Sequence, residues 1–154
     1  MAVFLVRHGV ALGRSAWPDA DQLRPLSKRG QRQSAGLVEV LAGEPIQRVL
    51  TSRAVRCRDT VRPLARKLGL DVRDHDSLYE GETAAALDLA TEVARKKGDS
   101  ALCSHGDVIP EVLRRLERLG LELPSDAECA KGSVWRLDWD GDRFIHARYL
   151  PPTD

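Results

Sequence analysis

A short apolar run that ends abruptly in charged residues constrains this chain more than any other feature. The run from Val3 to Val6 is entirely apolar, which is typical of a strand that is buried on both faces. Arg7 and His8 follow at once, and Gly9 allows the backbone to turn there. In open α/β sheets, ligands bind at the carboxyl ends of the strands. The start of the chain therefore predicts a buried strand that delivers Arg7 and His8 to a ligand site.

A second segment repeats this pattern later in the chain. The apolar run at 101–103 leads through a serine to His105 and Gly106, and Asp107 then begins a helical pattern. Two strands that each end in His-Gly can place two imidazoles side by side. We therefore expect the two histidines to share one site.

The rest of the chain alternates between predicted helices and strands, with an irregular stretch at 10–26 that is long enough to be functional. Helices are expected after the capping residues Ser27, Ser52 and Asp107, and a further helix is expected to open at Thr83. Strands are expected at 46–51 and 100–104, and 71–76 is expected to form a weak strand or an extended connection. Pro63 is expected to kink or interrupt the second helix. Within 132–150, Asp140-Gly141 predicts a hairpin. These ranges predict an α/β three-layer sandwich, in which a mostly parallel central sheet carries helices on both faces and ends in a C-terminal hairpin.

Composition excludes several classes of protein. A length of 154 residues suits one domain, residues 1–154, and 24 basic against 23 acidic side chains give no electrostatic reason to expect nucleic acid or a membrane as partner. Three cysteines without a C-x-x-C pair argue against a disulfide framework or a zinc ribbon. The apolar start is too short for a signal or membrane helix. We therefore expect a cytoplasmic domain, and composition does not indicate its oligomeric state.

Four cationic or ionisable residues are expected to converge at one edge of the sheet. Arg7, His8, Arg56 and His105 each lie where a strand ends or one turn into the following helix. Two arginines and two imidazoles form a pocket suited to a phosphoryl group. The same positive charge would repel a divalent cation, so no metal and no cofactor are expected. The Arg-rich run at 48–67 lacks aromatic residues, which favours a basic rim for anionic substrates over a nucleic-acid surface.

Five segments carry the motifs of one known family. These segments are "LVRHGVA", "LRPLSKRG", "LTSRAVRCRDTVRPLA", "LYE" and "LCSHGDVIPEVL", in chain order. On these motifs the chain resembles the histidine phosphatase superfamily (phosphoglycerate mutase-like), and "LRPLSKRG" is similar to a segment of its short, SixA-like branch. The chain also resembles the phosphatase domain that follows a Nudix domain in some actinobacterial hydrolases. Whether a Nudix protein is a partner of this chain does not follow from the motifs.

The resemblance implies a mechanism that the residue types support. Neutral His8 would attack phosphorus and form a phosphohistidine, which water then hydrolyses. Arg7, Arg56 and His105 would bind the phosphoryl oxygens and stabilise the charge of the transition state. Arg53 stands where the family usually has proline.

Further site residues follow from the same motifs. Arg24 would lie near the phosphate, and Gly9 and Gly106 are expected to contact the substrate. Glu80 would protonate the leaving oxygen and later deprotonate the attacking water. Three other carboxylates remain open as alternatives for this proton transfer, namely Asp19, Glu82 and Asp107.

The resemblance implies a metal-independent phosphatase that acts on phosphomonoesters or nucleotide phosphates. Its partner would be a phosphorylated small molecule. A protein phosphohistidine phosphatase is the first alternative, with a phosphohistidine protein as substrate. A non-catalytic module that binds phosphorylated ligands is an alternative from another class, although intact His8 and His105 speak against it. The mutases of this family carry insertions for which the chain has little length.

Overall fold

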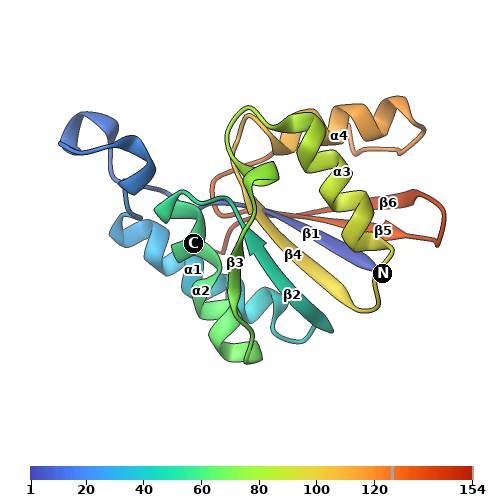
Figure 1. Ribbon diagram of the computed structural model, residues 1–154, viewed down its shortest axis with the longest axis horizontal. Helices are drawn as coiled ribbons and strands as arrows, with labels where there is room; N and C mark the ends of the chain where they lie inside the picture. The colour runs from blue at the N-terminus through green and yellow to red at the C-terminus, as the bar shows by residue number, and fades with distance from the viewer. Residues whose placement is uncertain (126, 154) are drawn as a thin grey trace.

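A six-stranded sheet forms the centre of the computed structural model, which describes residues 1–125 and 127–153. The strands lie in the order β3-β2-β4-β1-β5-β6 (Figure 1). The first four in this order are parallel, whereas β5 and β6 form an antiparallel hairpin that pairs with β1. Their bounds are β1 Ala2–Arg7, β2 Ile46–Thr51, β3 Val72–Asp74, β4 Asp99–Ser104, β5 Val134–Trp139 and β6 Phe144–Leu150.

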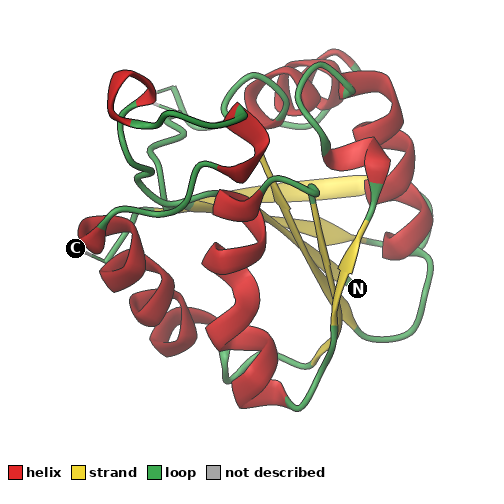
Figure 2. Cartoon of the chain, turned by 60° about the vertical axis from the view of Figure 1, so that its left-hand side comes forward, coloured by secondary structure: helices red, strands yellow, loops and turns green. Residues whose placement is uncertain are grey.

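Helices cover both faces of this sheet, so the predicted three-layer arrangement is confirmed (Figures 1 and 2). Helices α1 and α2 pack on one face, and α3 and α4 pack on the other. The α-helices are α1 Lys28–Leu41, α2 Val55–Leu68, α3 Thr83–Ala94 and α4 Ile109–Arg118, and the short 3₁₀ helices are η1 Arg14–Ala16, η2 Asp21–Leu23 and η3 Asp76–Leu78. Among the residues described, no helix is both long enough and apolar enough to cross a bilayer.

Strand β1 is continuously apolar because it contributes to two cores. Val3 and Leu5 pack with α3 and α4, whereas Phe4 and Val6 pack on the opposite face with α1 and α2. All four are buried. Each such side chain contributes about 1.5–3 kcal/mol through burial. The central strand therefore gives the residues that follow it a rigid support.

Two predicted helix starts are wrong by a few residues. The N-cap of α2 is Ala54 rather than Ser52, and the N-cap of α4 is Val108 rather than Asp107. Neither capping residue accepts a hydrogen bond with its side chain. Ser52 makes a hydrogen bond at the sheet edge instead, and the carboxylate of Asp107 accepts from the backbone N–H of Gly81 at 2.9 Å. Polar residues typical of caps are used here for contacts between loops. Helix α3 begins at Thr83, as predicted.

Helix α2 continues through Pro63, so the predicted interruption does not occur. A proline cannot donate to the carbonyl one turn earlier, which here is that of Asp59. The hydroxyl of Ser34, on α1, donates to this carbonyl oxygen at 2.9 Å. Because the neighbouring helix satisfies the orphaned acceptor, α2 runs on to Gly69, which adopts the left-handed conformation with φ 69°.

The sheet brings the two His-Gly segments together. Arg7 is the register partner of Ser104 in the parallel pair of β1 and β4, so both strands end at the same edge. From the other side, the N–H of Gly132 donates to the carbonyls of Arg7 and His8 at 3.1 and 3.0 Å. The turn after β1 is thus held by β4 on one side and by the turn that precedes β5 on the other. The segment at 10–26 extends away from the body of the molecule (Figure 1).

Candidate active site

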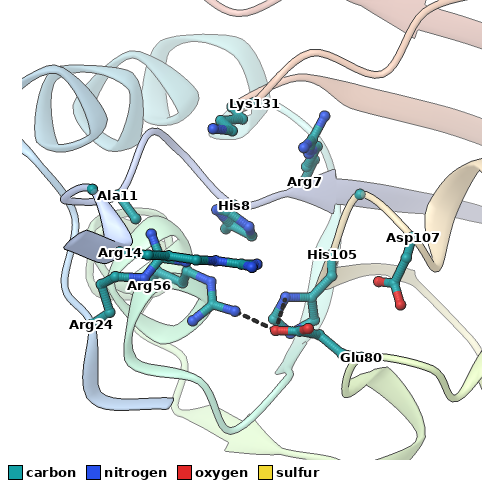
Figure 3. Close-up of a pocket in the computed structure, with 12 residues that line it drawn as sticks. Arg7, His8, Ala11, Arg14, Arg24, Arg56, Glu80, His105, Asp107 and Lys131 are labelled. Atoms are coloured by element: carbon teal, nitrogen blue, oxygen red, sulfur yellow. Dashed lines mark hydrogen bonds and ion pairs between the residues drawn. The ribbon is translucent and has the colours of Figure 1, made fainter. Parts of the chain in front are cut away.

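A cavity of about 510 Å³ opens at this edge of the sheet (Figure 3). Basic side chains predominate in its wall, which also contains two imidazoles and two carboxylates. The wall is formed by Arg7, His8, Ala11, Gly13, Arg14, Arg24, Arg56, Glu80, His105, Gly106, Asp107 and Lys131. Such a cavity suits a small anionic ligand.

His8 is held in one tautomer. Its Nδ1 atom lies 2.7 Å from the carbonyl oxygen of Gly9. Because a carbonyl can only accept, Nδ1 carries the proton and Nε2 carries the lone pair. Burial, together with the nearby His105, Arg56 and Arg7, lowers the pKa of His8 from 6.5 to about 3, against the opposing effect of the Gly9 hydrogen bond. His8 is therefore a neutral imidazole at physiological pH.

The backbone that follows His8 is fixed by two helices. Thr60 on α2 accepts from the N–H of Gly9 at 2.9 Å, and Gln33 on α1 accepts from the N–H of Val10 at 2.9 Å. Helix α1 also approaches closely at Gly30, where a Cβ atom would lie 2.1 Å from the carbonyl oxygen of Val10. These contacts fix the direction in which the imidazole points.

His105 lies opposite His8. The two ring centroids are 5.5 Å apart, and the rings meet edge to face. Nε2 of His105 is hydrogen-bonded to the hydroxyl of Ser52 at 2.8 Å, which leaves Nδ1 on the side of Glu80, at 3.7 Å from Oε1. Ser52 thus orients the second imidazole, a role that its position before a helical pattern did not reveal.

Arg56 is the most buried charge in the cavity wall, and two carboxylates bind it. Its side chain is 2% exposed and forms ion pairs with Glu80 and with Asp21, the latter at 3.3 Å. Figure 3 shows the Glu80 carboxylate between Arg56 and His105. Asp21 also contacts the Nε atoms of Arg24 and Arg14, at 2.9 and 3.8 Å. Asp21 therefore organises three arginines, although the sequence analysis did not single it out.

Arg7 and Arg24 are already engaged by backbone oxygens. Arg7 donates to the carbonyl of Cys129, and Arg24 donates to the carbonyl of Leu12 at 2.6 Å. Among the described residues, the buried Nε atoms of Arg7 and Arg56 have no hydrogen-bond partner. An unpaired buried N–H is costly, so both donors favour an anion that would satisfy them.

The cavity contains every predicted site residue except Gly9. Gly9 lies behind the wall and acts through its backbone, as the acceptor for His8 and the donor to Thr60. Of the alternative proton donors, Asp107 lines the cavity, whereas Asp19 and Glu82 do not. Two charged cavity residues, Arg14 and Lys131, were missed by the sequence analysis because neither lies in a motif, and the small residues Ala11 and Gly13 of the wall were not predicted either. Within 1–125 and 127–153, no group of three or more His, Cys, Asp or Glu side chains is arranged to hold a metal ion.

Comparison with known proteins decides the family. The model of the histidine phosphatase superfamily (branch 1) matches residues 3–86, more than half of the chain. The chain belongs to the histidine phosphatase superfamily. The resemblance expected from the motifs is thereby confirmed, and the matched range contains His8, Arg56 and Glu80.

Individual members of the superfamily resemble the whole chain. An 8-oxo-(d)GTP phosphatase of Mycolicibacterium smegmatis is 32% identical over 99% of this chain and 48% of its own length, so the chain spans about half of that relative. A structure assigned as the phosphohistidine phosphatase SixA of Agrobacterium tumefaciens is 25% identical, with a TM-score of 0.74 and 99% and 98% of the two chains covered. A protein histidine phosphatase SixA in complex with tungstate shares the fold, with 21% identity, a TM-score of 0.78 and 99% and 97% coverage.

Proposed function

We propose that residues 1–154 form one histidine phosphatase domain, which hydrolyses phosphomonoesters or nucleotide phosphates through a phosphohistidine intermediate. The observation that carries this proposal is His8, a buried neutral imidazole whose Nδ1 is bound to the Gly9 carbonyl in a cavity lined with arginines. Its Nε2 lone pair is the nucleophile that the chemistry needs. The nucleotide substrate is favoured by the similarity to an 8-oxo-(d)GTP phosphatase.

In the proposed first step, Nε2 of His8 attacks phosphorus and the bond from phosphorus to the leaving oxygen breaks. Arg7, Arg56 and His105 bind the phosphoryl oxygens, whose charge grows in the transition state. The incoming phosphoryl group competes with Glu80 for Arg56. Displaced from that arginine, the Glu80 carboxylate takes up a proton from solvent and gives it to the leaving oxygen.

In the second step, water attacks the phosphohistidine and releases inorganic phosphate. Glu80 takes one proton from this water, and the N–P bond breaks so that His8 regains its lone pair. In both steps, arginine side chains supply the positive charge that balances the phosphoryl oxygens, so we propose that the reaction requires no metal ion. A cytoplasmic location, expected from the three unpaired cysteines, belongs to the same proposal.

A protein phosphohistidine phosphatase is the second candidate. It is favoured by the likeness to the structure assigned as SixA, which is 25% identical and covers 99% of this chain. In that case the leaving group is the imidazole of a partner protein. A non-catalytic module for phosphorylated ligands is disfavoured, because its cavity would not need the His8 tautomer to be fixed.

The decisive experiment traps the intermediate. Acid-labile, base-stable label should appear on His8 when the protein is quenched during turnover of a ³²P-labelled substrate. The His8→Ala protein should neither become labelled nor turn over substrate, while its circular dichroism stays that of the wild type. Near-normal turnover by His8→Ala would refute the proposal.

A further inference from the structure

The two carboxylates that bind Arg56 come from two separate loops. Asp21 lies in the irregular segment at 10–26, and Glu80 follows η3. Neither loop is part of the sheet, so the sheet alone does not fix the distance between them. The hydroxyl of Ser104, at the end of β4, donates to the carbonyl of Leu78 at 2.6 Å and ties the Glu80 loop to the sheet, but this contact does not reach the segment of Asp21. A further contact is needed to join the two loops.

Arg53 connects these loops directly. Its guanidinium lies over the ring of Tyr79, 3.7 Å from the ring centroid, and its Nε donates to Oε1 of Gln22 at 3.2 Å. Its Nη1 is 3.3 Å from the carboxylate of Asp76. Gln22 is the residue after Asp21, and Tyr79 is the residue before Glu80. Each residue that Arg53 contacts thus lies one to four positions along the chain from Asp21 or Glu80.

The chemistry of arginine suits this connection. The Asp76 carboxylate is 91% exposed, so its ion pair with Arg53 contributes little by itself. The planar guanidinium can instead stack on an aromatic face while its edge donates to a second group, which lysine cannot do. One rigid side chain therefore sets the separation of Gln22 and Tyr79.

We propose that Arg53 is a positioning residue, which holds Glu80 at Arg56 and at the leaving group by joining the loops of Gln22 and Tyr79. This inference rests on the proposed function, because it deepens the role of Glu80 in it. Arg53 stands outside the cavity wall and acts only through the residues beside it. Removing it should impair the step that needs a proton donor and spare the steps that do not.

A double-mutant cycle tests this role. Arg53→Met keeps the length of the side chain but removes the charge and the planar group. With β-glycerol phosphate, it should lower kcat by about tenfold, since a small misplacement of a catalytic group costs that much. With para-nitrophenyl phosphate, kcat should change less than about twofold, because a phenolate leaves without a proton. In a Glu80→Gln background, Arg53→Met should cause no further loss with either ester.

Two controls match these variants. Arg95→Met makes the same change in a second cation–aromatic pair, in which the guanidinium lies 5.7 Å from the ring centroid of Trp139, and should leave both rates unchanged. Tyr79→Phe keeps the ring under Arg53 and should also retain activity. Arg53→Lys keeps the charge without the planar group, so it should behave like Arg53→Met.

The inference has a direct readout that does not depend on turnover. In a crystal structure of Arg53→Met, the Glu80 carboxylate should have left Arg56. A carboxylate that still binds Arg56 there would overturn the inference, as would equal losses with both esters or additive losses in the cycle. The proposed function would fail separately, if the wild-type protein formed no phosphohistidine.

Discussion

The carbonyl oxygen of Gly9 lies 2.7 Å from Nδ1 of His8, the residue directly before it. The nucleophile of the proposed reaction is therefore oriented by its own backbone rather than by a distant carboxylate. The hydrogen bond to this uncharged acceptor raises the pKa of His8, but it offsets only part of the cost of protonating a buried imidazole. The low pKa of His8 is the consequence, and it can be measured as an effect on stability.

Stability should fall in acid because of His8. Its pKa is about 3 in the folded protein, against 6.5 for an ordinary histidine. The unfolded chain therefore binds the extra proton between pH 6.5 and 3, and the folded state loses up to about 1.4 kcal/mol per pH unit across that window. Above pH 6.5 the effect is absent.

Chemical denaturation between pH 7 and pH 4 measures this dependence. The His8→Asn protein should lose less stability across the window than the wild type. His146→Asn is the matched control, because His146 is 63% exposed, and it should follow the wild-type curve. Identical slopes for His8→Asn and the wild type would show that His8 is not protected from protonation.

Arg56→Ala should remove on the order of 3 kcal/mol of transition-state stabilisation, by analogy with the loss of an oxyanion donor. The expected result is a fall in kcat/KM of about a hundredfold, measured under conditions where the variant is folded. Arg62→Ala, on the same helix, is the control, since Arg62 pairs with Asp59 at the surface. Arg56 would have no role in binding phosphoryl oxygens if both variants were equally active.

Activity should persist after exhaustive chelation, because arginines supply the positive charge of the site. Vanadate and tungstate should inhibit competitively by occupying the place of the phosphoryl group. Steady-state rates with and without EDTA measure the effect. Rates that drop with EDTA and recover with added zinc or magnesium would contradict the prediction.

Glu80→Gln should discriminate between substrates by their leaving groups. Alkyl phosphates leave as poor alkoxides, so their hydrolysis should slow about a hundredfold or more. Aryl phosphates and phosphohistidine peptides need less help and should be little affected. Asp107→Asn is the control, because Asp107 lines the same cavity. A loss confined to Asp107→Asn would transfer the proton-donor role to that residue.

Gly30→Ala should damage the site from a distance. The added methyl group would lie 2.1 Å from the carbonyl oxygen of Val10, so the turn after His8 would have to move. We expect a loss of about 1–3 kcal/mol of stability, typical of overpacking, together with a lower kcat. Gly43→Ala meets no atom within 4 Å and should affect neither. Thermal melts and rates of the two variants provide the comparison.

The parts of the fold that depend on local periodicity could be predicted from the sequence. Strand β2 has the predicted bounds, and Ser27 caps α1 by accepting from the N–H of Gly30. The apolar run at the start of the chain also predicted β1, and Asp140-Gly141 predicted the hairpin of β5 and β6. Helix starts were missed where a polar side chain had a stronger partner in another loop, as Ser52 has in His105.

The candidate site was predictable only where motifs mark it. The motifs identified Arg7, His8 and His105 as neighbours at one edge of the sheet, and the structure brings them together. Asp21 was not predicted because its role is to form ion pairs with three arginines, Arg14, Arg24 and Arg56. No motif in the sequence links it to them. Ionic contacts of this kind leave no periodic signal in the chain.

The position of β1 in the middle of the sheet has a consequence for how the protein is made. β1 pairs with β4 and β5, both of which are synthesised long after it. Contacts so distant in sequence form late and slow the folding of a chain. A nascent chain that has not reached Gly132 and Ser133 therefore lacks the hydrogen bonds that hold the backbone of Arg7 and His8 on the side of β5. A chain interrupted before that point carries His8 without the contacts that fix its turn, although strand β1 itself has long been made.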